Sequence, residues 1–152
     1  MAITRSLGRS GAQVVVGAPG GRGLAQYSRY ASGVLPLPSS DPAAMASAIL
    51  ETLAERSFTH VIAAEEALIV RLNEHRSLLE SYCDPLFPAE PAFSECLYKQ
   101  RTLARAHRLG IPAPRTLTPA SLAELEVCRD WRYPVVFKPA HRDPRERHGG
   151  AR

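Results

Sequence analysis

The sequence predicts an α/β protein with a mostly parallel β-sheet. Short apolar runs at 13–16 and 60–64 alternate with longer segments at 42–55 and 67–82, in which apolar residues recur at helical spacing. Strands and helices that alternate in this way typically form a parallel sheet with right-handed crossovers. The chain has 152 residues, of which 45% are hydrophobic, so it is long enough and apolar enough to bury a core.

The N-terminal elements are short and end at glycine or proline. We expect a helix at 2–7, which stops at the glycines that follow, and then a buried strand at 13–16. A second strand at 34–37 contains Pro36 and precedes Pro38, and these prolines restrict it to a sheet edge or a strand end.

The helix that begins after Asp41 has the clearest signals in the chain. Asp41 is a favourable N-cap, Pro42 fits the first helical turn, and apolar residues continue along one face to about Glu55. A short strand at 60–64 and an amphipathic helix at 67–82 follow, which completes the alternation of strands and helices.

A proline-rich segment at 84–91 (DPLFPAEP) breaks the helical pattern and indicates a linker. We therefore place one domain at 1–88 and the opening segment of a second at 89–140. The last residues, 141–152, form a polar, arginine-rich tail that is too hydrophilic to pack.

The second part of the chain is also predicted to contain helix and strand. Ser94 is a suitable N-cap for a helix that ends near Gly110, where a left-handed residue is favoured. The prolines keep 111–114 extended, a second helix follows Thr118, and the run at 133–137 (YPVVF) predicts a strand.

Charge and cysteine content narrow the classes of function. The net charge of +4 is too small to require a nucleic-acid or membrane partner, and no apolar run approaches the roughly 20 residues of a membrane span. Three cysteines occur without a C-x-x-C pair, which favours a reduced setting and small packing residues over a zinc site or a catalytic thiol. With no apolar segment typical of a secretory signal, we expect a cytoplasmic protein.

Two further features have both a functional and a structural interpretation. The loop at 17–23 (GAPGGRG) follows a strand, but its glycine spacing matches neither standard phosphate-binding loop, so a flexible surface loop is favoured. Glu65 and Glu66 lie where open α/β sheets place ligand-binding residues, and they also suit the start of a helix for reasons of the helix dipole alone.

The two lysines are unusual because the chain has seventeen arginines and only Lys99 and Lys138 as lysines. A lysine ammonium is a compact charge suited to a phosphate oxygen in a narrow pocket, and a lysine at the end of a buried strand is a poor core residue. The structural alternative is that both are solvated surface charges. Each lysine also lies within a recognisable sequence motif.

The segments 96–116 (CLYKQRTLARAHRLGIPAPRT) and 133–139 (YPVVFKP) resemble, in order and separation, two motifs of the ATP-grasp superfamily of carboxylate–amine ligases. The first family motif is a helix of the form (D)K-x-x-(x)-A-x-x-x-G-I-P-x-P, and the second is a strand of the form P-V-[VI]-[VIF]-K-[PA]. Tyr98 stands where the family usually has Asp. The matching positions are Lys99, Ala106, Gly110, Ile111, Pro112 and Pro114 in the first motif and Pro134, Val135, Val136, Phe137, Lys138 and Pro139 in the second.

This resemblance implies that Lys99 and Lys138 contact the phosphates of ATP. It implies ATP-dependent ligation of a carboxylate to an amine through an acylphosphate. It also implies that residues 1–88, including the stretch Ser28-Arg29-Tyr30, form the Rossmann-like domain that precedes ATP-grasp, with the nearest likeness to carbamoyl-phosphate-synthetase-like proteins.

Several parts of the family pattern have no counterpart in this sequence. The family has a strand before a helix like that at 2–7, and after Lys138 it has a glycine-rich flap, an adenine pocket and the Glu and Asn side chains that hold magnesium. We therefore expect a fragment that binds nucleotide at most, with no catalytic or metal-binding residues of its own and with strand edges open to pairing with another chain. The alternative is a non-enzymatic α/β interaction or regulatory module whose basic tail docks on an acidic surface.

Overall fold

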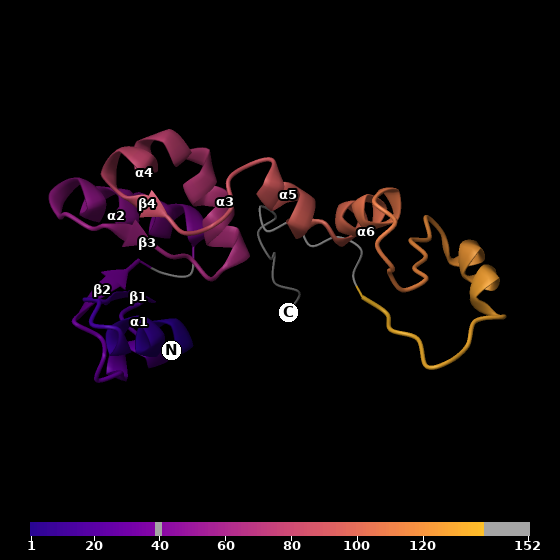
Figure 1. The fold of residues 1–152 in the computed structure, drawn as a ribbon, viewed down its shortest axis with the longest axis horizontal. Coiled ribbons are helices and arrows are strands. Elements are labelled where there is room, and N and C mark those ends of the chain that lie inside the picture. The colour runs from indigo at the N-terminus through magenta and orange to yellow at the C-terminus, as the bar shows by residue number, and fades with distance from the viewer. Residues whose placement is uncertain (39–40, 139–152) are drawn as a thin grey trace. The chain divides into compact units, whose positions relative to one another are not determined.

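Apolar strands and amphipathic helices alternate along this chain and produce a mixed α/β architecture with parallel strand pairs (Figure 1). The computed structural model describes residues 1–38 and 41–138. The chain divides into two compact units, Met1–Phe87 and Pro88–Arg152. The predicted tail at 141–152 lies outside the described residues.

The first unit contains two parallel pairs of strands. β1 pairs with β2 from Val15↔Gly33 to Pro19↔Leu37, and β3 pairs with β4 through His60↔Asp84 and Val61↔Pro85. The α/β class and the parallel pairing are thus confirmed. The elements in order are α1 (Ala2–Arg9), β1 (Val15–Pro19), the 3-10 helix η1 (Leu24–Tyr27), β2 (Gly33–Leu37), α2 (Pro42–Glu55), β3 (His60–Val61), α3 (Glu66–Glu74), α4 (Arg76–Tyr82) and β4 (Asp84–Pro85).

β1 begins and ends later than the sequence predicts. We expected a strand at 13–16 and a loop from Gly17, but β1 continues to Pro19 because β2 offers it a partner along its whole length. The chain then turns at Gly20 and Gly21, whose φ angles of 58° and 68° favour glycine. The Gly20 N–H donates to the Leu37 carbonyl at 2.8 Å, so this turn is held to the end of β2.

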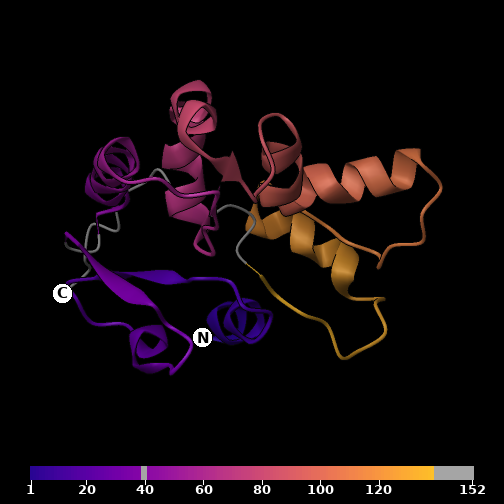
Figure 2. The same cartoon turned by 60° about the vertical axis from the view of Figure 1, so that its left-hand side comes forward.

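α2 follows the predicted signals closely. The Asp41 side chain accepts a hydrogen bond from the Ala43 N–H at 3.3 Å, and Pro42 is the first helical residue. Figure 2 shows α2 and α3 on the opposite side of the β1–β2 pair from α1. The core of the unit is apolar, and its most deeply buried large side chains are Met45, Leu72 and Leu79.

Two predicted features of this unit are wrong in detail. The helix expected at 67–82 is divided at His75 into α3 and α4, and the strand expected at 60–64 is limited to His60–Val61. A two-residue strand suffices here because its partner β4 is equally short.

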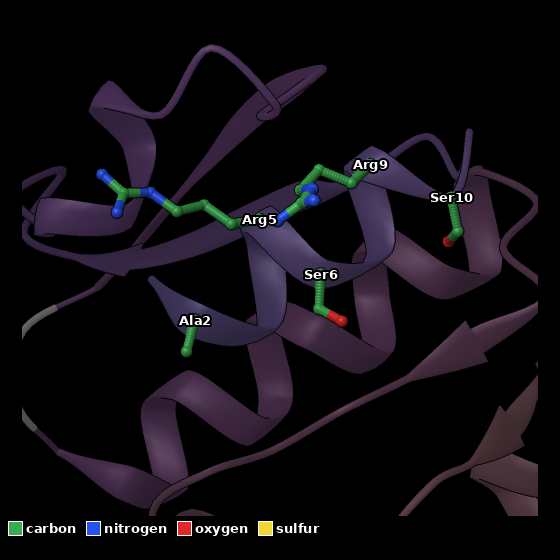
Figure 3. A pocket seen from close by; sticks show the side chains of 5 residues that line it. All are labelled: Ala2, Arg5, Ser6, Arg9 and Ser10. Atoms are coloured by element: carbon green, nitrogen blue, oxygen red, sulfur yellow. The ribbon is translucent and has the colours of Figure 1, made fainter.

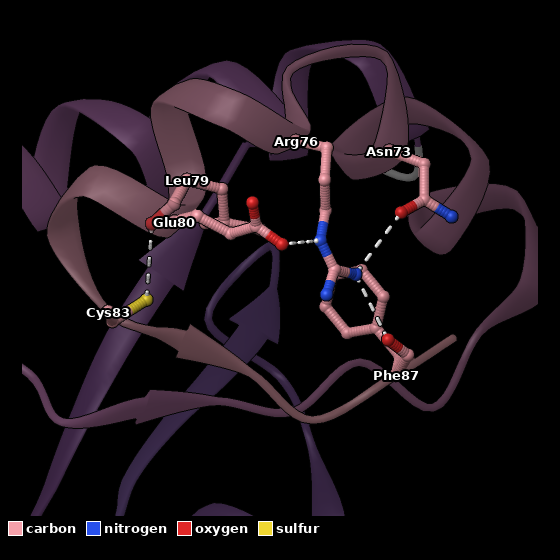
Figure 4. Close-up of polar contacts among 6 residues, drawn as sticks. All are labelled: Asn73, Arg76, Leu79, Glu80, Cys83 and Phe87. Carbon is pink, nitrogen blue, oxygen red and sulfur yellow. Dashed lines mark hydrogen bonds and ion pairs between the residues drawn. The ribbon is translucent and has the colours of Figure 1, made fainter. Parts of the chain in front are cut away.

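The start of the predicted linker belongs to the first unit. Asp84–Pro85 forms β4, and Phe87 is buried. Figure 4 shows the Arg76 guanidinium holding this segment: its Nη1 donates to the Phe87 carbonyl at 3.0 Å, and its Nε donates to Glu80 Oε1 at 2.6 Å. The prolines at 84–88 therefore end the helical pattern, but the chain remains packed against the core as far as Phe87.

The second unit contains the helices α5 (Ala92–Leu97), α6 (Lys99–Arg108) and the 3-10 helix η2 (Leu122–Cys128). The single helix predicted from Ser94 is divided at Tyr98, whose backbone is extended (φ −91°, ψ 104°). Ser94 lies within α5 and is not an N-cap. The Thr102 hydroxyl donates to the Glu95 carbonyl at 2.7 Å, which ties α6 to α5 across the break.

The C-terminal elements of this unit differ most from the prediction. The helix expected after Thr118 is a 3-10 helix that begins at Leu122. The run at 133–137 is irregular and is not a β-strand, because among residues 88–138 no neighbouring strand is present to pair with it. Val136 and Phe137 are each 79% exposed.

Candidate functional site

Lys99 is the first residue of α6 and its side chain is exposed. Tyr98 is the N-cap residue, and the Arg101 guanidinium lies 4.7 Å from the centroid of the Tyr98 ring. The helix carries positive charge along its length, with no carboxylate in its sequence KQRTLARAHR. The interaction between the Lys99 ammonium and the helix dipole is unfavourable, because a cation at this end lies beside the positive end of the dipole.

Lys138 is the last described residue of the irregular run at 133–138 and is exposed. The expected position at the end of a buried strand is therefore wrong, because this run has no strand partner among the described residues. Within residues 1–38 and 41–138, no ion pair includes Lys99 or Lys138, and every ion pair there uses an arginine or a histidine.

Lys99 and Lys138 are the two lysines that the sequence assigns to phosphate binding. Both lie in the second unit, at opposite ends of its described sequence after α5.

The glycine of the first motif ends α6. Gly110 has a φ of +67°, its N–H donates to the His107 carbonyl at 3.1 Å, and the Ile111 N–H donates to the Ala106 carbonyl at 2.9 Å. These two bonds form a Schellman motif, which satisfies carbonyls that the helix end would leave free. The prediction of a left-handed residue at this helix end is confirmed. Three matched positions of the motif thus have a structural role, whereas Lys99 has none among the described residues.

Glu65 and Glu66 lie at the start of α3, as the sequence predicts. Glu65 is the N-cap residue, Glu66 lies in the first turn, and both are exposed. Carboxylates at this position interact favourably with the helix dipole. In the part of the chain that the structure describes, no group of three or more His, Cys, Asp or Glu side chains is placed to hold a metal ion.

Cys83 is a structural thiol. Its Sγ lies 3.8 Å from the Leu79 carbonyl, which accepts from it (Figure 4). Burial raises the pKa of the Cys83 thiol above its ordinary value, and the negative charge of Asp84 raises it further. The neutral thiol is a weak nucleophile, so the packing interpretation of this cysteine fits the structure.

Two arginines on α1 were not among the candidate residues predicted from the sequence. Arg5 and Arg9 line a shallow surface hollow together with Ala2, Ser6 and Ser10 (Figure 3). Two signals were present in the sequence: the arginines are four residues apart, and no acidic residue occurs in residues 1–40.

None of the helices in residues 1–38 and 41–138 combines the length and the apolar character that a membrane span requires. Comparisons of the chain with known protein families, with curated proteins and with solved structures found no match.

Proposed function

We propose that this chain binds the phosphates of ATP through Lys99 and Lys138, as part of an ATP-dependent carboxylate–amine ligase of the ATP-grasp superfamily. One observation carries the proposal: the chain's only two lysines fall on the lysine positions of two motifs in the correct order, and both are exposed without an ion pair among the described residues. An ammonium that lacks a protein partner is available to a phosphate oxygen.

The electrostatics of α6 support an anionic ligand near Lys99. The ten-residue helix has one lysine, three arginines and no carboxylate, and its positive dipole end lies at Lys99. A phosphate bound there interacts favourably with the ammonium and with the helix N-terminus, whereas the free helix keeps an uncompensated positive charge.

The lysines would act as fixed cations that reduce the negative charge of the transferring phosphates. In the family, magnesium shares this charge, and the side chains that hold it belong to later parts of the domain. The role that we propose for Lys99 and Lys138 is therefore the binding of nucleotide phosphates.

The proposal treats the first unit as the Rossmann-like domain that precedes ATP-grasp. Among the described residues β1–β2 and β3–β4 form two separate two-stranded sheets, and the proposal treats both as pieces of one larger family sheet. Edges that are not paired within such a sheet are available to a strand from another chain.

A thermal melt with and without Mg-ATP tests the proposal. A ligand that binds only the folded state adds about 2.7 kcal/mol of stability at 100 times its dissociation constant, which raises the midpoint by several degrees. We expect this increase in the wild type and its loss in Lys99→Ala and Lys138→Ala. The matched controls Arg108→Ala and Arg132→Ala remove an exposed cation from the same unit and should keep the increase.

A second candidate function, a non-enzymatic interaction module, is favoured by the uncovered apolar run near the end of the described chain. Tyr133 is 67% exposed, and Val136 and Phe137 are each 79% exposed. Exposed apolar groups of this kind often mark a surface that contacts another protein. A cooperative melt that Mg-ATP does not shift in the wild type would contradict nucleotide binding and favour this second function.

A further inference from the structure

The charges of the first unit are divided between two parts of its fold. Residues 1–40, which supply α1, β1, η1 and β2, contain four arginines and no lysine, aspartate or glutamate. Residues 41–87, which supply α2, β3, α3, α4 and β4, contain eight carboxylates and three arginines. One part of the unit is therefore basic and the other is acidic.

The outer face of α1 concentrates the basic charge. Arg5 and Arg9 are one helical turn apart, both are exposed, and the small side chains of Ala2 and Ser6 lie beside them (Figure 3). No ion pair or hydrogen bond to an acidic group is formed by either arginine in residues 1–38 and 41–138. Like charges at this spacing repel each other, so the face favours an anionic partner.

The outer face of α2 is the acidic counterpart. Glu51 and Glu55 are also one turn apart and exposed, and the small residues Ser47 and Ala54 are exposed with them. Met45, Ala46 and Leu53 are the residues of α2 buried in the core. Neither glutamate forms an ion pair with any other described residue.

These two faces cannot satisfy each other within one molecule. Figure 2 shows α1 and α2 on opposite sides of the β1–β2 pair. The ion pairs of the unit are instead local, such as Arg71–Glu74 at 2.9 Å and Arg76–Glu80 at 2.6 Å.

We propose that α1 of one copy of this chain docks against α2 of a second copy, with Arg5 and Arg9 opposite Glu51 and Glu55. The two pairs have the same one-turn spacing, so both ion pairs form at once. The small residues beside them let the helices approach closely. Because the two faces lie on opposite sides of the unit, the contact is head-to-tail and leaves a free face at each end. The contact involves one helix from each copy, so the association is weak and depends on ionic strength.

Analytical ultracentrifugation of the full chain tests this association. At an ionic strength of about 0.01 M, where the Debye length is about 30 Å, we expect the average mass to rise with concentration above the 16.6 kDa monomer. At about 1 M, where the Debye length is about 3 Å, the chain should be monomeric. A monomer at every concentration in low salt would overturn the proposal.

Charge reversal identifies the faces. Arg5→Glu with Arg9→Glu, and separately Glu51→Arg with Glu55→Arg, should each weaken self-association at least tenfold. An equimolar mixture of these two variants should associate again, and so should the variant that carries all four substitutions. As a control, Glu65→Arg with Glu66→Arg changes the net charge as much as the second variant does and should leave association intact.

Two results would contradict the assignment of the faces. Association that survives both double reversals would place the contact elsewhere on the molecule. A mixture that stays monomeric, although both variants melt cooperatively, would show that these two faces do not meet.

Discussion

The two units of this chain differ in how they are held together. Of the twelve buried hydrophobic residues among the described ones, eleven lie in the first unit and only Phe93 lies in the second. The contacts of the second unit include the Schellman motif at Gly110 and the Arg115 guanidinium 4.8 Å from the Trp131 ring centroid. The stability of the folded chain therefore resides mainly in the first unit.

The difference has a functional counterpart. Lys99 and Lys138 both belong to the second unit, where few side chains fix their positions. A region with little buried apolar surface opens locally at low free-energy cost. Ligand binding would order such a region more than it orders a unit that already has a core.

The largest expected effect is the loss of a core side chain from the first unit. Leu72 is completely buried, so Leu72→Ala should lower the free energy of unfolding by about 2–5 kcal/mol. Phe93→Ala should change the main urea transition much less, because Phe93 belongs to the second unit, which has no other buried hydrophobic residue among the described ones. Equal decreases in the free energy of unfolding for the two substitutions, measured by urea unfolding, would contradict this difference between the two units.

A smaller effect is expected at the end of α6. Gly110→Ala places a side chain on a residue with a φ of +67° and should cost about 1 kcal/mol. The cost should be visible as faster amide hydrogen exchange in α6 and not as a change in the main transition. Gly110→Asn is the control, since asparagine tolerates this backbone conformation better than alanine.

The smallest effect concerns the Cys83 thiol, whose pKa is raised from 9.0 in the folded chain. The folded state keeps this proton more tightly than the unfolded state, so the stabilisation is complete below pH 9.0 and declines as the pH rises above that value. Cys83→Ala should lack this decline in a series of alkaline urea melts. An unchanged decline in Cys83→Ala, with Cys96→Ala as the matched control, would assign the effect to other groups.

Local signals in the sequence were sufficient for part of the fold. Asp41 and Pro42 determine where α2 begins, and Gly110 determines where α6 ends, because each acts through its own backbone or side chain. The pairing of β1 with β2 agrees with the α/β pattern. Such features need no information about distant parts of the chain.

Features that depend on distant residues were missed or misplaced. A run such as YPVVF has the same composition whether or not a neighbouring strand exists, so the sequence predicted a strand at 133–137 that has no partner among the described residues. β4 was not predicted because Asp84–Pro85 is short and contains a proline. The break at Tyr98 was missed because no proline or glycine marks it in the sequence.

The candidate site was predicted in composition but not in geometry. The scarcity of lysine in an arginine-rich chain drew attention to Lys99 and Lys138, and the structure leaves both exposed. Nothing in a linear sequence gives the distance between them. Arg5 and Arg9 were missed because two arginines four residues apart are common on solvated helices.

Hydrogen exchange of the full chain with and without Mg-ATP tests the central claim most directly. We predict that ATP slows exchange at the start of α6, around Lys99, and along 133–138, and that it leaves the core helices α2 and α3 unchanged. The variant with both Lys99→Ala and Lys138→Ala should lose this protection, and the variant with both Arg108→Ala and Arg132→Ala should keep it. No protection in the wild type, or protection that survives loss of both lysines, would contradict the assignment of these residues to phosphate binding.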